Sequence, residues 1–163
     1  MLSIVFVKPE IPGNTGSVAR TCLALNARLI LIRPYGFDIS EKACRRAGLD
    51  YFKHVALTEY DDWDSFIKGE TPDPNSLFFF SKKAATSYFD ARFNENSYLV
   101  FGSETKGLPP TLFKLYPERF FSIPMLSTKV RSLNLSNAAT AVAYEALRQR
   151  GAMLLSPESG NKT

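Results

Sequence analysis

Short, almost uninterrupted apolar runs recur along the chain, and they restrict its possible folds more than any other feature. The run Leu77-Phe78-Phe79-Phe80 has no polar position, so a strand formed from it must be buried on both faces, as in a parallel sheet. Similar runs alternate with segments whose apolar residues recur at helical spacing. We therefore expect an α/β fold, with a mostly parallel sheet and helices on both faces.

The element boundaries follow from the same pattern. Strands are predicted at Leu2–Val7, Leu29–Arg33, His54–Leu57, Leu77–Phe80, Tyr98–Phe101 and Phe120–Ile123. Helices are predicted at Gly16–Asn26, Glu41–Ala47, Asp61–Lys68 and Pro110–Tyr116, and from Leu135 to a stop at Gly151.

Length and charge limit the functional classes. The 163 residues are enough for one domain with a core of its own. We expect residues 1–155 to form that domain and residues 156–163 to form a flexible tail. No apolar run approaches the roughly 18 residues needed to span a membrane. The net charge of +4 and the pI of about 9.1 favour a polyanionic partner without identifying one.

The cysteines and the histidine argue against a metal centre. Cys22 and Cys44 lie in predicted helices without metal-ligating neighbours, and no signal peptide is recognisable, so we expect buried thiols in a cytoplasmic protein. His54 is the only histidine, which disfavours a His-based metal site and a Ser-His-Asp triad. No metal is expected.

Three loops rich in Gly, Pro and small polar residues stand between a predicted strand and a helix. They are Pro9–Arg20, Gly102–Pro109 and the stretch Arg131–Ala139 at the start of the last helix. In open α/β sheets, ligands bind at the carboxyl ends of the strands. The three loops therefore predict one composite ligand site.

Each loop taken alone has a simpler explanation. In the third loop a capped helix and a ligand-gripping helix N-terminus remain equally acceptable. For Gly102 and Gly107, ordinary turn geometry would be enough. The first strand is not followed by G-x-G-x-x-G, and Leu108-Pro109 stands where a P-loop has Lys-Ser/Thr.

The order of the three loops resembles the SPOUT class of RNA methyltransferases. The most similar members are the small single-domain enzymes that methylate the ribose 2′-hydroxyl at the tRNA wobble position. The resemblance runs from Met1 to about Gly151. It is carried by Pro9–Gly16 with Arg20, Arg45–Tyr51, Gly102–Gly107, Ile123-Pro124-Met125 and Ser132–Asn137.

This resemblance implies a fold and a cofactor. The C-terminal segment would be threaded through a loop to form a deep trefoil knot within roughly residues 77–150. S-adenosylmethionine would bind among the loops of the knot. The residues implied in cofactor binding are Phe80, Gly102, Glu104, Gly107, Ile123, Met125, Ser132 and Leu133.

The resemblance also implies catalytic residues. Arg20 matches the family's functional arginine. Because a guanidinium stays protonated to above about pH 12, we expect it to grip the target phosphate and to stabilise the developing alkoxide. Glu104 has an alternative interpretation as an ion-pair partner of Lys106 or Arg20. The remaining candidates for orienting Arg20 or the ribose are Asn14, Ser132 and Asn134.

The partners implied are a tRNA anticodon loop and a second copy of the chain. In this family the arginine acts across a homodimer interface, here expected to involve the first and last helices. Unpaired loop bases can splay outward to reach a small enzyme. The residues expected to contact RNA are Arg20, Arg45, Arg46, Lys129, Arg131 and Tyr144, with Lys82 and Lys83 as further phosphate contacts.

The predicted function is 2′-O-methylation of the wobble nucleotide, a cytidine or a carboxymethylaminomethyl-uridine, in leucine tRNAs. One alternative is the same chemistry at another tRNA or rRNA position. A second is a non-catalytic RNA-binding protein of the same fold, and a third is a nucleotide-binding metabolic enzyme.

Overall fold

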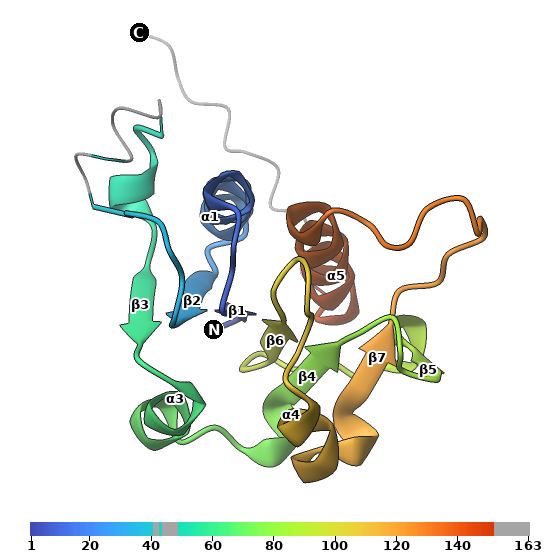
Figure 1. The fold of residues 1–163 in the computed structure, drawn as a ribbon. Helices are drawn as coiled ribbons and strands as arrows, with labels where there is room; N and C mark the ends of the chain where they lie inside the picture. Colours follow the sequence, from blue (N-terminus) through green and yellow to red (C-terminus); the bar gives the residue numbers. More distant parts are fainter. Residues whose placement is uncertain (41–42, 44–48, 152–163) are drawn as a thin grey trace, which may run out of the picture.

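The computed structural model describes residues 1–40, 43 and 49–151 (Figure 1). Its centre is a seven-stranded sheet in the order β3-β2-β1-β6-β4-β7-β5, and every pairing is parallel. The strands are β1 (Ser3–Val7), β2 (Arg28–Ile32), β3 (Leu57–Tyr60), β4 (Leu77–Phe80), β5 (Thr86–Ser87), β6 (Tyr98–Phe101) and β7 (Phe120–Ser122).

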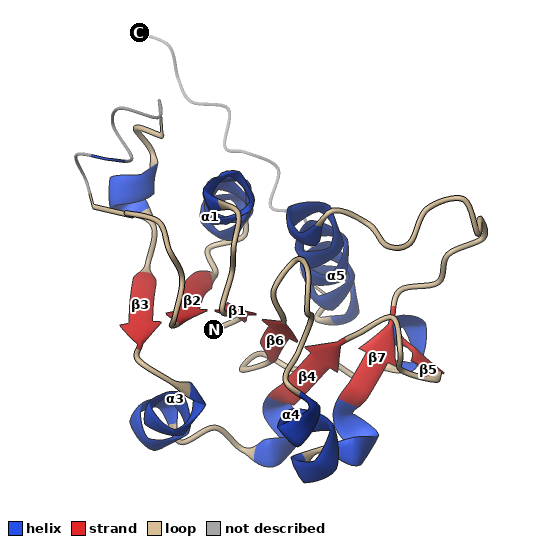
Figure 2. Ribbon diagram, viewed as in Figure 1, coloured by secondary structure: helices blue, strands red, loops and turns tan. Residues whose placement is uncertain are grey.

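Helices cover both faces of this sheet (Figure 2). Helices α1 and α5 lie side by side on one face, joined by a 2.8 Å hydrogen bond between the hydroxyls of Thr21 and Thr140. Helices α3 and α4 lie on the opposite face. The helices are α1 (Pro12–Ala24), α3 (Trp63–Glu70), α4 (Pro110–Leu115) and α5 (Leu135–Gln149), with 3-10 turns at Phe52–His54, Pro74–Ser76, Tyr88–Asp90 and Pro117–Arg119.

The core has two layers, one on each side of the sheet. Along β4, Phe78 and Phe80 join the layer under α1 and α5, whereas Leu77 and Phe79 join the layer over α3 and α4. All four side chains are buried. The expectation drawn from this apolar run, a strand covered on both faces, is therefore confirmed.

Several predicted boundaries were wrong. A strand was predicted at His54–Leu57, but a 3-10 turn ends at His54 and the strand is Leu57–Tyr60. This strand lies at the edge of the sheet and is only partly buried, so it lacks an apolar run. Helix α1 begins at Pro12 rather than Gly16, because proline is well suited to the first helical position.

Smaller differences have local causes. Helix α3 begins at Trp63 instead of Asp61, since Asp62 is its N-cap and accepts a hydrogen bond from the Ser65 backbone. The two-residue strand β5 was not predicted, as it has no apolar alternation. Apart from Ala43, the helix predicted at Glu41–Ala47 lies outside the described residues, as do Cys44 and the tail from residue 156. Cys22 is buried in α1 as expected.

The sheet topology brings the three predicted loops together. Strand β1 pairs with both β2 and β6, and β6 separates β1 from β4. The loops that follow β1, β4, β6 and β7 therefore lie together at the carboxyl ends of the parallel strands, where α5 also begins (Figure 1). Within the described part of the chain, no helix is long and apolar enough to cross a membrane.

Candidate functional site

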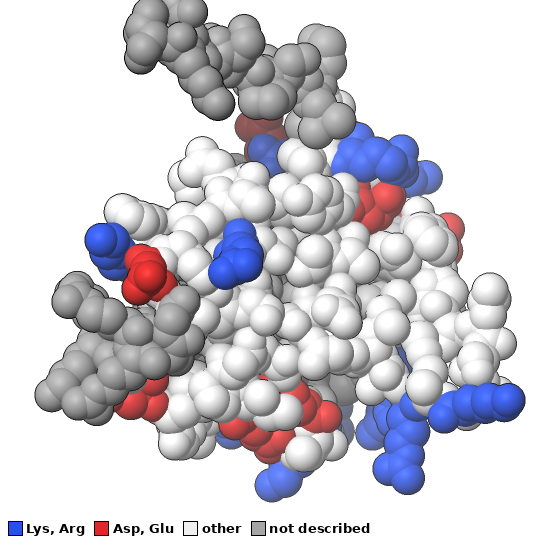
Figure 3. Space-filling model, turned by 90° about the horizontal axis from the view of Figure 1, so that it is seen from above, with Lys and Arg blue, Asp and Glu red and all other residues white. Residues whose placement is uncertain are grey.

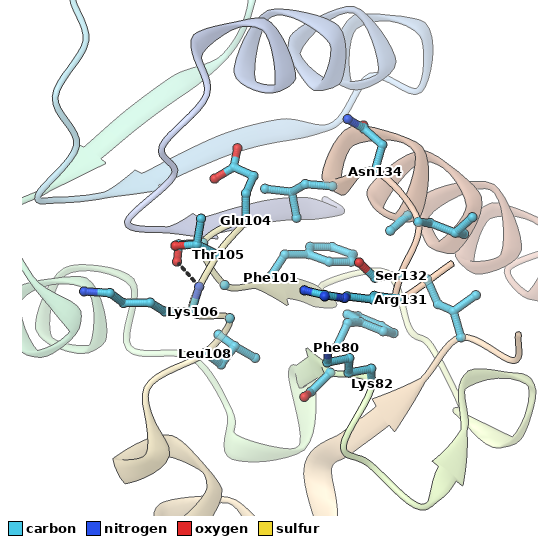
Figure 4. Close-up of a pocket in the computed structure, with 18 of the residues that line it drawn as sticks. Phe80, Lys82, Phe101, Glu104, Thr105, Lys106, Leu108, Arg131, Ser132 and Asn134 are labelled. Carbon is cyan, nitrogen blue, oxygen red and sulfur yellow. Dashed lines mark hydrogen bonds between the residues drawn. The ribbon is translucent and has the colours of Figure 1, made fainter. Parts of the chain in front are cut away.

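A cavity of about 440 Å³ opens at the carboxyl ends of these strands. Its walls come from the loops after β4, β6 and β7 and from the start of α5 (Figure 4). All eight predicted cofactor-binding residues line it: Phe80, Gly102, Glu104, Gly107, Ile123, Met125, Ser132 and Leu133. Most of the wall is apolar, with Phe101, Leu108 and Phe113 adding to the predicted apolar side chains.

The loop after β6 is a tight turn that leaves no room for a side chain at Gly102. Ser103 and Gly107 exchange backbone hydrogen bonds of 3.3 and 2.9 Å. A Cβ at Gly102 would lie 2.0 Å from the carbonyl carbon of Gly107, and Gly107 itself has φ +69°. Turn geometry thus explains both glycines, and it fixes the backbone that forms the cavity wall.

Glu104 ties the loop after β6 to the loop after β1. Its carboxylate accepts hydrogen bonds from the backbone N–H of Glu10 at 2.7 Å and of Ile11 at 3.2 Å, and from Asn14 Nδ2 at 2.8 Å. In return, Glu10 accepts from the backbone N–H of Thr105 at 3.1 Å and from its hydroxyl at 2.8 Å. We call this exchange the glutamate clasp.

The alternative interpretation of Glu104 finds no support within one chain. It was a possible ion-pair partner of Lys106 or Arg20, but among the described residues it forms a salt bridge with neither. Its oxygens are used by the clasp.

The clasp continues to the last helix through two asparagines. Asn134 Nδ2 donates to Asn14 Oδ1 at 2.9 Å. The Oδ1 of Asn134 accepts from the backbone N–H groups of Ser136 at 2.9 Å and Asn137 at 3.3 Å, and from the Ser136 hydroxyl at 2.7 Å. Asn134 is therefore the N-cap of α5, and it also links α5 to α1. Asn134 is thus both the cap of this helix and a residue of the candidate site.

Positive charge gathers around the cavity. Arg131 lies across it between Phe101 and Phe80 (Figure 4). Within the described part of the chain, its guanidinium has no hydrogen bond or salt bridge partner. The other cationic lining residues are Lys82, Lys83 and Lys106, whereas the acidic lining residue, Glu104, is held in the clasp.

Arg20 does not line the cavity. It lies on the exposed side of α1, with its guanidinium carbon 4.6 Å from the centre of the Tyr51 ring. The Tyr51 hydroxyl donates to the Gly16 carbonyl at 2.9 Å, which holds that ring against α1. The structure therefore brings Asn14, Glu104, Ser132 and Asn134 together but leaves Arg20 outside.

The other predicted RNA-contacting residues are scattered. Arg131 reaches the cavity, whereas Lys129 and Tyr144 are exposed away from it. Arg45 and Arg46 lie outside the described residues. Sequence reasoning missed the partners Glu10 and Thr105. Glu10 stands in the first predicted loop, but nothing in the sequence indicates which residue it contacts.

A family model describing the SpoU rRNA Methylase family matches residues 1–144. The chain belongs to the SpoU methylase family. It is 44% identical over 152 residues to the tRNA (cytidine(34)-2′-O)-methyltransferase of Burkholderia cenocepacia, an alignment that covers 93% of this chain and 97% of that one.

Two solved structures share the fold. A structure described as giving insight into the 2-OH methylation of C/U34 on tRNA has a TM-score of 0.81 and 44% identity, covering 91% of this chain and 95% of that one. The SpoU methyltransferase AviRb from Streptomyces viridochromogenes, in complex with the cofactor AdoMet, has a TM-score of 0.77 and 28% identity, covering 94% of this chain and 62% of that one.

Proposed function

We propose that this protein transfers a methyl group from S-adenosylmethionine to the ribose 2′-hydroxyl of nucleotide 34 in tRNA. The target would be cytidine or carboxymethylaminomethyl-uridine in leucine isoacceptors. The observation that carries the proposal is the cavity, in which the three loops characteristic of the family converge. The 44% identity to an enzyme named for the 2′-O-methylation of cytidine 34 supports the choice of target.

The cavity fits an adenosyl cofactor. Apolar side chains such as Phe80, Ile123 and Leu133 can enclose an adenine ring, and the backbone around Gly102 and Gly107 offers polar groups for its edges. A volume of about 440 Å³ is within the usual range for such ligands. When bound, the cofactor supplies a methyl group already activated on a sulfonium, so the protein has mainly to bind and orient its substrates.

The residues of the clasp act by positioning. The side-chain oxygens of Glu104, Asn14 and Asn134 accept hydrogen bonds from one another's amide groups or from backbone N–H groups. They hold the loop after β6 against α1 and fix the start of α5. Ser132 stands at the rim and remains a candidate for contacting the ribose.

Arg20 supplies a positive charge for the RNA, whereas the residues of the clasp position the loops. Its described contact is the face of Tyr51, which leaves its five N–H groups available for a phosphate or a developing alkoxide. A phosphate or water would take the hydroxyl proton, because the guanidinium is already protonated. Lys129, Arg131 and Tyr144 would contact other parts of the anticodon loop.

The active site would be shared between two subunits of a homodimer. Arg20 does not line the cavity of its own chain, which supports a site in which another chain presents its Arg20. The surface over α1 and α5 carries few charged side chains (Figure 3), as expected for the centre of a protein interface.

The threading of the chain and its cellular compartment also remain proposals. Family membership supports a deep trefoil knot in roughly residues 77–150, with α5 in the threaded segment. A tRNA substrate would place the protein in the cytoplasm.

The proposed function is tested by methyl transfer in vitro. Purified protein is incubated with labelled S-adenosylmethionine and a leucine tRNA, and with the same tRNA carrying 2′-deoxyribose at position 34. We expect transfer to the first and not to the second. Equal transfer to both would place the target elsewhere in the RNA, and transfer without RNA would favour a metabolic enzyme. RNA binding with neither cofactor binding nor transfer would favour a non-catalytic RNA-binding protein.

A further inference from the structure

A second cavity, of about 640 Å³, lies beside the first. It is formed where β1 and β2 end, and the loop Ser103–Leu108 separates it from the cofactor cavity by serving as a wall of both. We call it the Lys8 pocket. Its main lining residues are Lys8, Pro9, Pro34, Tyr35, Lys106 and Pro109.

The walls of the Lys8 pocket are rigid and largely apolar. Proline rings come from three separate segments, at Pro9, Pro34 and Pro109. Tyr35 is held in place at both ends, since its hydroxyl donates to Glu59 and the Arg33 guanidinium lies 4.9 Å from its ring centre. Preformed flat walls of this kind suit a planar ligand, because little conformational freedom is lost when it binds.

The charge in the pocket is available for an anion. Neither the Lys8 nor the Lys106 ammonium has a hydrogen bond or salt bridge partner among the residues that the structure describes. The acidic group in the lining, Glu10, has both oxygens engaged by Thr105 in the clasp. Two free cations therefore face a pocket whose one carboxylate is already used.

Lys8 is held in an unfavourable backbone conformation. Its φ of +56° is in the left-handed region, which glycine adopts freely and lysine rarely does. Its backbone N–H nevertheless donates to the Ile32 carbonyl at 2.8 Å. Strain of this kind collects at functional sites. On backbone conformation alone, glycine would be the favoured residue at this position.

We propose that the Lys8 pocket holds the nucleotide next to the methylated one in the RNA strand. Lys8 and Lys106 bind its phosphate, and its base packs against the prolines and Tyr35. This assignment rests on the proposed function, because it takes an RNA ribose to be the methyl acceptor. Positive grooves with flat side chains are the usual means of holding single-stranded nucleic acid, and one loop's thickness separates the two sites.

The first test is Lys8→Gly, which removes the charge and relieves the strained backbone. We expect KM for tRNA to rise about three- to tenfold. The slope of log affinity against log salt should become shallower by about 0.7, as expected for one lost phosphate contact to a single strand. Affinity for S-adenosylmethionine and the unfolding midpoint should not fall. Lys68→Ala on α3 removes the same charge at a residue that lines neither cavity and serves as the control.

A wild-type salt slope and KM in Lys8→Gly would overturn the proposal. If the wild-type protein transfers no methyl group, the proposed function fails, and the pocket is then judged by the salt slope of direct tRNA binding. A second measurement uses leucine tRNA with 5-iodouridine at position 33 or 35 and maps the photo-crosslink by mass spectrometry. A crosslink at Tyr35 supports the pocket, and one confined to residues outside it refutes it.

Discussion

At the residue scale, most of the polar side chains predicted to form the site are hydrogen-bonded to one another. Glu104, Asn14 and Asn134 form one hydrogen-bonded chain across segments 90 and 120 residues apart. Their membership of a common site could be predicted from loop composition and family resemblance. Their partners could not, because nothing local in the sequence pairs Glu10 with Thr105, which lie 95 residues apart.

The clasp should contribute measurable stability. Glu104→Gln replaces a charged acceptor of two backbone N–H groups with an amide whose nitrogen cannot accept. Hydrogen bonds to charged groups are worth about 1.5–3 kcal/mol, so we expect the free energy of unfolding to fall by about 2 kcal/mol in urea titrations. Affinity for S-adenosylmethionine should also decrease. Glu118→Gln, an exposed change away from the clasp, should leave both unchanged; equal losses in the two variants would contradict a specific role.

Gly102 should tolerate no side chain. In Gly102→Ala the new Cβ would meet the backbone of Gly107 at 2.0 Å, so the cavity wall must move. Overpacking of this kind costs about 1–3 kcal/mol or more, and cofactor binding should be lost. Gly13→Ala is the matched control, since its Cβ would meet nothing within 4 Å. Calorimetry of both variants with and without cofactor decides the matter, and wild-type cofactor binding by Gly102→Ala would contradict it.

At the element scale, buried strands were predicted more accurately than partly buried ones. Strand β4 is buried on both faces and was predicted with its observed bounds, Leu77–Phe80. Strand β3, at the edge, has Glu59 exposed within it and was misplaced by three residues. An apolar run reports burial rather than strand formation itself. Edge strands and the two-residue β5 are therefore difficult to detect from sequence.

A partly buried carboxylate links several strands and should make stability depend on pH. Burial opposes ionisation of Glu70, but hydrogen bonds from Arg28, Tyr60 and Tyr98 outweigh this and lower its pKa. A carboxyl with a lowered folded pKa stabilises the protein above its unfolded value, about 4.3, and this stability is lost as the pH falls through the folded pKa.

The measurement is urea unfolding between pH 7 and pH 3. We expect the wild-type midpoint to fall over the acidic part of this range. Glu70→Gln should lower the midpoint at pH 7 and reduce its pH dependence, whereas Glu118→Gln should preserve the wild-type curve. A Glu70→Gln variant as acid-sensitive as the wild type would assign the effect to other carboxylates.

At the scale of the whole molecule, the parallel sheet brings the functional loops together at the carboxyl ends of its strands. One chain nevertheless holds only part of the proposed site. The cavity and Arg20 belong to different surfaces of the same subunit. Composition and periodicity predicted the layered α/β architecture. They contained no information about how two copies meet or how the chain is threaded, because both depend on surfaces and crossings that leave no periodic pattern.

A shared site predicts complementation between two inactive variants. Arg20→Ala removes the arginine, and Leu133→Arg, at a position 42% exposed, adds bulk and charge to the cavity without disturbing the core. Each homodimer should lose most of its activity. In the mixed dimer, the intact cavity of one subunit meets the intact Arg20 of the other, so about half of wild-type activity per dimer should return. No recovery in purified, differently tagged mixed dimers would place Arg20 and the cavity in the same subunit's site.

The most direct test of the central claim is a map of ribose 2′-O-methylation in total tRNA. It compares cells with and without the gene, and cells rescued by wild type or by Arg20→Ala. We expect the mark at position 34 of leucine tRNAs to disappear with the gene, to return with the wild type and to stay absent with Arg20→Ala. A mark at position 34 that persists without the gene would contradict the proposed target.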